Sequence, residues 1–297
     1  MEQLTQGFIN GVMLGGFYAA MVLGFSVIWG VMGVINLAHG EFLMVGAYLT
    51  WVLDKIFGFD AFAALIIVIP VMFAVGVLVQ WVLINRVVER PHLVSLLVTF
   101  GLGIAIANVV KLIFGADPRI TDTALSGFWR ISNTSVTIPV TKFFITLVAL
   151  TMMTALYLFL QRTRLGKSIR AAAQNKEAAR MVGIEIKLVY FLTFGICIAI
   201  VGAAGMLVST TQAIFPFMGP PFTLKAFAIT AMAGLGNIPG VLLGGIVLGL
   251  VEVLVGIYVP GIGTNLGVIS SYVLLVLILI IRPQGLFGGL KPATEVR

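Results

Sequence analysis

The sequence predicts an all-α protein that forms one domain and crosses a membrane eight or nine times, short interrupted segments included. Three observations lead to this prediction. Of the 297 residues, 60% are hydrophobic and only 10% are charged, whereas about 25% of a soluble globular protein is charged. The apolar residues gather into stretches of about 20, the length of a helix that spans a bilayer. Glycines recur four residues apart in two places, a spacing typical of helices that pack closely in lipid.

The charge and cysteine content exclude several classes of protein. Eighteen Lys and Arg against eleven Asp and Glu give a net charge of +7. Even so, the small polar share excludes a soluble enzyme, a nucleic-acid-binding protein and a disordered chain. Cys197 is the only cysteine, so no internal disulfide can form. Residues 1–26 hold no Lys or Arg; because a secretory signal begins with a positive region, we expect a retained first helix.

Four predicted membrane segments precede a long polar stretch. The second of them is short and is interrupted by Asn36, His39 and Glu41. Polar groups at this depth favour a broken or re-entrant segment that is surrounded by protein, because lipid cannot satisfy them. The four segments are residues 5–31, 35–53, 61–84 and 93–114.

Five further segments are predicted after the polar stretch 115–139. A charged loop, residues 161–187, separates the first of them from the second, and prolines and glycines separate the others. Two of the five are shorter than a full membrane span. The five segments are residues 140–160, 188–214, 222–235, 241–259 and 266–281.

Basic residues predict the side of the membrane on which each loop lies, because Lys and Arg gather in short cytoplasmic loops. The loop 161–187 carries seven Lys and Arg against two Glu, a net charge of +5, so we place it in the cytoplasm. Two more basic clusters fall on the same side, and the stretch 115–139, whose charges cancel, falls outside. These clusters are Arg86 with Arg90, and Arg282 with Lys291 and Arg297.

Two glycine runs predict the helix packing and an inverted repeat. Each run adjoins a short interrupted segment, 35–53 or 222–240, and such pairs of broken segments are typical of transporters built from two inverted halves. We expect halves of about 1–135 and 136–297; the alternative is the ordinary glycine enrichment of membrane helices. The runs are Gly7, Gly11 and Gly15, and Gly236, Gly240 and Gly244, with Gly245 and Gly249 adding a second stripe beside the later run.

No set of residues in the sequence predicts catalysis. The string 164–168, RLGKS, resembles the end of a phosphate-binding loop, but that motif needs a glycine where Gln161 stands and a strand before it. His39 and His92 are far apart, and one cysteine supplies neither a zinc site nor a nucleophile with its base. We therefore expect no catalytic residue, metal or cofactor in this chain.

Ionisable residues within the membrane segments are candidates for function, because burying them in lipid is costly. His39 and Glu41 either line or gate a pathway, if the chain unwinds around Gly40, or cap the second segment near the cytoplasm; we favour the structural alternative. Glu252 lies between Gly249 and Gly256 on one helix face, so it faces a packed neighbour. It either lines a pathway or bonds to an adjacent helix.

The remaining polar side chains in the segments have simpler interpretations. Lys111 and Lys225 lie close to predicted outer ends, so we expect their ammonium groups to reach the membrane surface. Asn36 and Asn108 are interpreted as hydrogen-bond donors between helices and not as substrate ligands.

The cytoplasmic loop contains a predicted amphipathic helix from Ser168 to Gly183. Ser168 can cap its start and Gly183 can end it. Its apolar side is mostly alanine, which is too shallow to anchor in lipid, so we expect it to dock onto a protein. The predicted apolar side is Ile169, Ala172, Ala173, Ala179 and Val182, and the predicted wet side is Arg170, Lys176, Glu177 and Arg180.

Three stretches resemble one known family over essentially the whole chain. They are 36–48 (NLAHGEFLMVGAY), 166–184 (GKSIRAAAQNKEAARMVGI), and the glycine run 234–252 together with 282–288 (RPQGLFG). The family is the permease subunit of bacterial branched-chain amino-acid ABC importers, of the shorter of its two permease types. Relatives with similar patterns carry urea, amides, sugars or nucleosides, so a different cargo on the same scaffold is the main alternative.

The resemblance implies partners in the bacterial cytoplasmic (inner) membrane. They are a second homologous permease, two cytoplasmic subunits that bind ATP and Mg, and an extracytoplasmic substrate-binding protein, with no nucleic acid. Glu177, Ala178, Ala179 and Gly183 match the EAAxxxG core of the ABC-permease coupling loop, although its I-x-L-P extension is absent. The helix 168–183, with Ser168, Arg170 and Arg180, is then the coupling helix.

The pathway and its energy source remain open at the level of sequence. The candidate pathway or gating residues are Asn36, His39, Glu41, Phe42, Phe227 and Glu252. A competing class is a proton-coupled secondary transporter, in which His39, Glu41 or Glu252 would relay protons.

Overall fold

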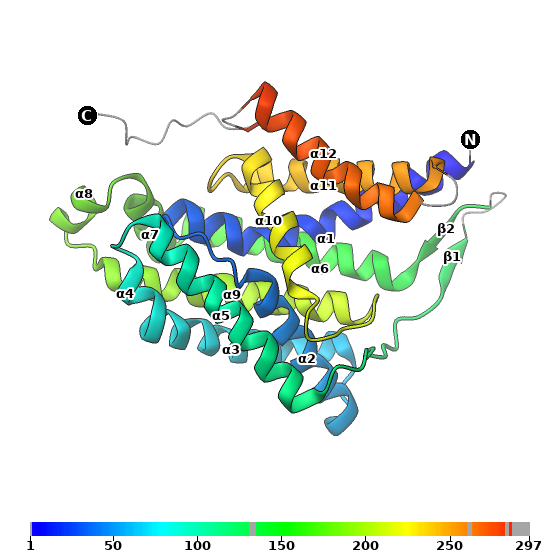
Figure 1. The fold of residues 1–297 in the computed structure, drawn as a ribbon, viewed down its shortest axis with the longest axis horizontal. Coiled ribbons are helices and arrows are strands. Elements are labelled where there is room, and N and C mark those ends of the chain that lie inside the picture. Colours follow the sequence, from blue (N-terminus) through cyan, green and yellow to red (C-terminus); the bar gives the residue numbers. More distant parts are fainter. Residues whose placement is uncertain (1, 131–134, 260–262, 283–284, 287–297) are drawn as a thin grey trace.

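The protein folds into a helical bundle, as the sequence predicts. The computed structural model describes residues 2–130, 135–259, 263–282 and 285–286 (Figure 1). The helices are α1 (Glu2–Met32), α2 (His39–Phe57), α3 (Ala61–Val79), α4 (Asn85–Val87), α5 (His92–Phe114), α6 (Val140–Arg162), α7 (Arg164–Gln174), α8 (Lys176–Met181), α9 (Ile186–Ser209), α10 (Gly219–Ala233), α11 (Ile238–Tyr258) and α12 (Gly263–Ile281). A π-helix, η1 (Gln80–Ile84), joins α3 to α4, and β1 (Phe128–Arg130) pairs with β2 (Thr137–Pro139).

Six helical segments of the described chain are long and apolar enough to cross a membrane: α1, the continuous helix 61–87, α5, α6, α9 and α11. The helix α2 has 19 residues, α10 only 15, and the apolar part of α12 is short as well. The total of eight or nine segments therefore stays a prediction.

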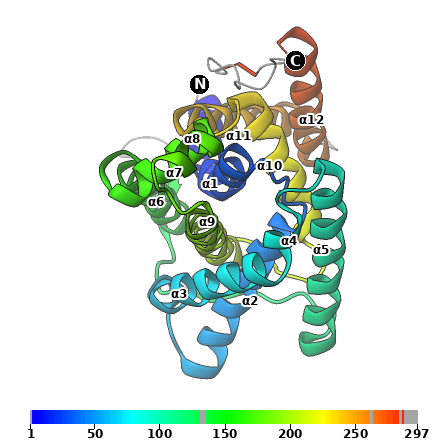
Figure 2. The ribbon, with the colours of Figure 1, turned by 90° about the vertical axis from the view of Figure 1, so that its left-hand side faces the viewer.

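The helices α1 and α9 form the centre of the bundle (Figure 2). In their most apolar windows, 89% and 78% of the residues are buried, against 22% in the helix 61–87. The outer helices expose large apolar side chains, among them Ile66 and Leu112. Such surfaces are stable in lipid, where apolar side chains lose nothing by exposure.

The two ends of the bundle differ, and polar contacts identify them. At the hairpin end, which carries β1 and β2, the Gln6 side chain bonds to the backbone of Thr137, and Lys55 forms an ion pair with Asp122 at 2.7 Å. At the opposite end, here the α8 end, Glu89 bonds to α8 (Figure 1). The stretch 115–139 and the loop 161–187 therefore lie at opposite ends, as predicted.

The basic clusters gather at the α8 end. Arg86 and Arg90 flank Glu89, and the amide of Leu286 donates to the carbonyl of Met232 at the end of α10, which places Arg282 there too. Lys291 and Arg297 lie outside the described residues.

Close packing of α1 on α11 depends on four glycines. The helices run antiparallel, with Gly15 of α1 between Gly245 and Gly249 of α11. A Cβ atom on Gly15 would lie 2.5 Å from the Cα atom of Ile246, and one on Gly249 would lie 2.5 Å from the amide nitrogen of Gly15. Gly11 meets Leu250 in the same way. This confirms that Gly11 and Gly15 pack helices.

The sequence suggested that the second glycine run forms one helix face, but in the structure it does not. Gly236 lies before α11 with φ of +70° and faces Gly30, where backbones approach closely. A Cβ on Gly240 would meet the carbonyl oxygen of Ala233 at the end of α10 and the side chain of its own capping residue, Asn237, and one on Gly244 would make only ordinary contacts with α10. The interlocking glycines of α11 are Gly245 and Gly249, because α11 begins at Ile238 and these two lie on the face toward α1.

Two interrupted segments run in opposite senses. The helix α1 runs to the α8 end, residues 33–38 return toward the centre without helical structure, and α2 runs from there to the hairpin end. The helix α9 runs to the hairpin end, residues 210–218 return without helical structure, and α10 runs to the α8 end.

The helix packing shows the same correspondence, with α9 in the place of α1 and α3 in the place of α11. The antiparallel contact of α1 with α11 has a counterpart between α9 and α3, where Gly76 lies against Gly195 and Ile198. In this correspondence α6, α7 and α8 come, along the chain, between the first set of helices (α1 to α3) and the second set (α9 to α11). The inverted repeat and its half-boundaries stay predictions.

Candidate functional site

The first turns of α2 and α10 meet inside the bundle. The amide of Gly40 donates a hydrogen bond to the Thr223 hydroxyl at 2.8 Å, and that hydroxyl donates to the carbonyl of Leu37 at 3.3 Å. A Cβ atom on Gly40 would overlap the carbonyl of Gly219, the first residue of α10. Glycine therefore permits the backbones of the two interrupted helices to touch at this point.

The non-helical residues 33–38 are held by α5 and by their own side chains. The Thr99 hydroxyl accepts from the amide of Leu37 and lies 3.1 Å from the carbonyl oxygen of Ile35. Asn36 is buried, and its Oδ1 accepts from the amide of Ala38 at 3.1 Å. Among the described contacts Asn36 thus stabilises the turn before α2 and does not bond between helices, and Asn108 donates within α5 to Ile104. The interhelical interpretation of both was wrong.

His39 and Glu41 point to different sides of α2, as a spacing of two residues on a helix requires. The Nε2 atom of His39 lies 2.9 Å from the carbonyl oxygen of Met21, in the middle of α1, and the ring packs edge-on against Phe25. His39 is fully buried and Glu41 is 6% exposed. The expected interfacial position near the cytoplasm was therefore wrong, and the break lies before His39 and not around Gly40, because α2 begins at His39.

Glu41 lies between the first turn of α10 and α5. A Cβ atom on Gly219 would lie 2.8 Å from the carboxyl carbon of Glu41, and a Cβ on Gly103 would lie 3.4 Å from it. The two glycines leave the space that the carboxylate occupies. Its Oε2 atom has no hydrogen-bond partner among the described residues.

The two aromatic candidates pack within the bundle. Phe42 is 1% exposed and contacts the ring edge of Phe194, with 6.4 Å between centroids. Phe227 of α10 stacks on Trp29 of α1 at 5.3 Å. Both residues belong to helices that meet at the site, and their pathway roles stay predictions.

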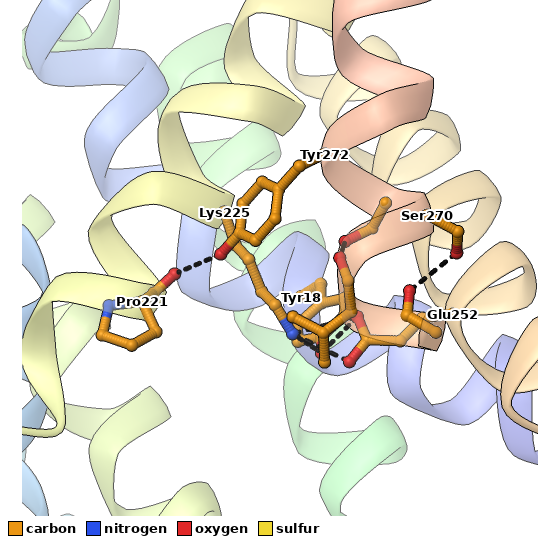
Figure 3. A network of polar contacts seen from close by, with 9 residues as sticks. Tyr18, Pro221, Lys225, Glu252, Ser270 and Tyr272 are labelled. Carbon is orange, nitrogen blue, oxygen red and sulfur yellow. Dashed lines mark hydrogen bonds and ion pairs between the residues drawn. The ribbon is translucent and has the colours of Figure 1, made fainter. Parts of the chain in front are cut away.

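A buried ion pair joins α10 to α11 beside α1 (Figure 3). The ammonium of Lys225 lies 2.9 Å from both carboxylate oxygens of Glu252 and donates to the Tyr18 hydroxyl, which in turn donates to Glu252 at 3.0 Å. Lys225 is 7% exposed. The expectation that it reaches the membrane surface was wrong, because α10 starts inside the bundle and this places its second turn beside Glu252. Lys111, by contrast, is exposed over the Phe217 ring near the end of α5.

Glu252 bonds to adjacent helices, one of the two alternatives left open by the sequence. A third helix closes the same region: the hydroxyl of Tyr272 on α12 lies 3.5 Å from the carbonyl oxygen of Pro221 (Figure 3). The network thus ties α10 to α1, α11 and α12.

The predicted helix 168–183 is two helices. Thr163 caps α7 by accepting from the amide of Gly166, and Asn175 caps α8 by accepting from the amide of Ala178. Ser168 is not the cap, because α7 begins four residues earlier; its hydroxyl donates to the carbonyl of Arg164. Gly183 ends the element with φ of +83°, as predicted.

The buried side of α7 and α8 agrees with the sequence at Ile169, Ala172 and Ala179. Ala173 of α7 and Val182 after α8 are exposed, so the predicted apolar side does not continue as one face across the break at Asn175. Arg170, Glu177, Ala178 and Arg180 are exposed as well, and Met181 is 84% exposed.

Glu89, which sequence reasoning did not single out, fastens α8 to the segment after α4. Its Oε1 atom lies 2.7 Å from the Lys176 ammonium and 3.0 Å from the Arg180 guanidinium. These hydrogen bonds, that from Lys176 first, lower the pKa of the Glu89 carboxyl below its usual value. The ion pairs of Glu89 with Lys176 and Arg180 are therefore present at neutral pH and weaken as the pH falls through that lowered pKa.

The comparisons with known proteins agree with this architecture. The family model described as "Branched-chain amino acid transport system / permease component" matches residues 7–281. The chain belongs to this permease family. It is 30% identical to the high-affinity branched-chain amino acid transport system permease protein LivH of Escherichia coli K12, over 98% of this chain and 96% of that protein. It is also 30% identical to BraD of Pseudomonas aeruginosa, over 98% and 97%.

A second type of permease also matches. The chain is 25% identical to the permease protein LivM of Escherichia coli K12, over 99% of this chain and 73% of that protein. Family membership and the apolar helices make this chain a multi-pass membrane transport component.

Three residues that form the site in this permease were not predicted from its sequence. Tyr18, Thr223 and Gly219 complete the site, yet each is a common residue in an apolar helix. A usable signal existed only for Tyr18, whose hydroxyl must find a partner when it is buried.

Proposed function

We propose that this permease is a subunit of an ATP-driven importer of branched-chain amino acids in the cytoplasmic membrane of a bacterium. The observation that carries the proposal is the meeting of two interrupted helices, α2 and α10, at the centre of a chain of this family. Broken helices that meet within the membrane are where transporters hold and pass their substrates. The names of the relatives support the cargo, because they describe branched-chain amino acid transport.

The path forms with a second permease of the same family. The match to LivM, a permease of another type, supports such a partner. Rocking of the two permeases would expose the region around Gly40 and Gly219 to either side in turn. Asn36 from the turn before α2, His39 and Phe42 from α2, and Phe227 from α10 are carried by the elements that would move.

ATP acts through the α8 end. Glu177 and Ala178 are exposed there, as are the apolar side chains of Met181 and Val182, at 84% and 76%. Apolar side chains exposed outside a membrane span are typical of a surface that another protein covers. We assign α7 and α8 as the contact with two cytoplasmic subunits that bind ATP and Mg, and the hairpin end as the contact with a substrate-binding protein.

Uptake of labelled leucine tests the proposal in cells that lack this chain and in cells that carry it again. Uptake is expected to return with the chain, to survive a protonophore at constant ATP, and to be blocked by unlabelled isoleucine and valine. Urea and ribose serve as competitors that should have no effect.

Each other outcome selects an alternative. Collapse with the protonophore at constant ATP would contradict the ATP-driven importer and favour proton coupling. Leucine uptake that does not depend on the chain would contradict the proposed cargo. Chain-dependent leucine uptake that urea or ribose blocks would show that the transporter takes solutes of that class.

A further inference from the structure

Glu41 is a buried acid without a cationic partner at the point where two helices begin. It is 6% exposed, its Oε2 atom has no hydrogen-bond partner, and it forms no ion pair with any described residue. The nearby cation on α10, Lys225, is already committed to Glu252 and Tyr18. An isolated buried carboxylate is costly, so a residue of this kind in a membrane protein points to a ligand.

The carboxylate of Glu41 lies at the N-terminal ends of two helices. The residue stands in the first turn of α2, and its carboxylate packs against Gly219, the first residue of α10. The positive ends of two helix dipoles therefore converge on one carboxylate. A negative group held in this way attracts a cation.

The free oxygen of Glu41 faces Gly103 of α5. A Cβ atom built on Gly103 of α5 would make ordinary contact, at 3.5 Å from Oε2 and 3.4 Å from the carboxyl carbon. A primary ammonium group is about as large as a methyl group, and it approaches a carboxylate oxygen to about 2.8 Å. A side chain at Gly103 would thus lie against Oε2, and its absence leaves that side of the oxygen uncovered by α5.

We propose that the Glu41 carboxylate binds the α-ammonium group of the transported amino acid at the junction of α2, α5 and α10. The inference rests on the proposed function, because it assigns to that cargo the one cation that every such amino acid carries. Glu41 is then a substrate-binding residue, and the lack of a side chain at Gly103 leaves its Oε2 atom uncovered on the side of α5.

Leucine uptake by Glu41→Gln, Glu41→Asp and Gly103→Ala variants tests the assignment. Loss of a charge-assisted hydrogen bond predicts that Glu41→Gln lowers the rate of uptake on the order of 10- to 100-fold. Glu41→Asp, which keeps the charge, should recover part of the rate. Gly103→Ala should lower uptake because its methyl group would lie 3.5 Å from Oε2 and crowd an ammonium bound to that oxygen.

The matched control is Gly101→Ala, two residues away on the same helix. A Cβ atom there meets nothing within 4 Å, and Gly101 is exposed. Both substitutions change helix propensity equally, so a loss of uptake in Gly103→Ala alone reports on the space beside Glu41. Uptake within twofold of the wild type in both Glu41→Gln and Gly103→Ala would overturn the assignment.

A binding measurement separates ligand contact from a structural role and from the proposed cargo. The purified transporter, with its partner subunits but without the binding protein, is heated with leucine, with 3-methylbutan-1-amine, or with 4-methylpentanoate. Leucine and the amine should raise the unfolding temperature of the wild type but not that of Glu41→Gln, and the acid without an ammonium should raise neither.

Equal shifts in the wild type and Glu41→Gln would overturn the role of Glu41 even if leucine uptake is confirmed. Conversely, a wild type that imports no leucine but is stabilised by the amine in a Glu41-dependent way would overturn the proposed cargo and leave the ammonium site standing.

Discussion

Replacement of Lys225 by Met is expected to destabilise the protein by about 3–5 kcal/mol, because it leaves Glu252 charged and buried without its cation. The Lys225 ammonium and the Glu252 carboxylate are 2.9 Å apart, and their side chains are 9% and 13% exposed. For a chain of this size the loss corresponds to a fall of roughly 10 °C in the unfolding temperature. Heating the purified protein in detergent and measuring the monodisperse fraction gives that temperature.

A double variant distinguishes a broken ion pair from lost packing. Lys225→Met with Glu252→Gln removes both charges and keeps an acceptor for the Tyr18 hydroxyl, so it should be more stable than either single variant. Lys111→Met serves as the control on the exposed face of α5 and should change stability by less than about 0.5 kcal/mol. Additive losses in the double variant would contradict the ion-pair account.

Replacement of Gly15 by Ala should separate α1 from α11. The new methyl group would lie 2.5 Å from the Cα atom of Ile246 and 2.8 Å from the carbonyl oxygen of Gly245, and backbone atoms cannot rotate away as a side chain can. Overpacking of this kind costs about 1–3 kcal/mol, and more where a whole helix must shift. Reduced yield of the folded protein and a lower unfolding temperature measure the effect.

Gly244→Ala is the matched control on α11. Its methyl group would lie 3.4 Å from the nearest atom, a side-chain carbon of Ile229, so stability should change by less than about 1 kcal/mol. If Gly15→Ala were as stable as Gly244→Ala, the glycine contact would not determine the packing of α1 on α11.

The sequence predicted the elements that depend on local pattern. Runs of about 20 apolar residues placed most helices within a few residues of their observed ends, and the basic loops predicted which ends share a side. An interruption around residues 35–41 was also predicted, because polar residues break an apolar helix visibly, although it lies at residues 33–38 and not around Gly40.

The sequence could not predict contacts that depend on how interrupted helices are placed. Lys225 was expected near the membrane surface because nothing local shows that α10 begins inside the bundle. The division of the loop at Asn175 depended on a single cap within an alanine-rich stretch that favours one helix. The setting of Glu41 depends on Gly103 and Gly219, which are 62 and 178 residues away from it.

The central claim, that the path passes between α2 and α10, is tested most directly by the accessibility of a cysteine at Thr223 to a membrane-impermeant maleimide. Thr223→Cys, with Cys197 replaced by Ala, is expected to be unreactive at rest, since Thr223 is 5% exposed, and to react during ATP-driven transport. Ile66→Cys, 80% exposed on the outer face of α3, should stay unreactive because it faces lipid. A Thr223→Cys variant that transports leucine yet never reacts would contradict the claim.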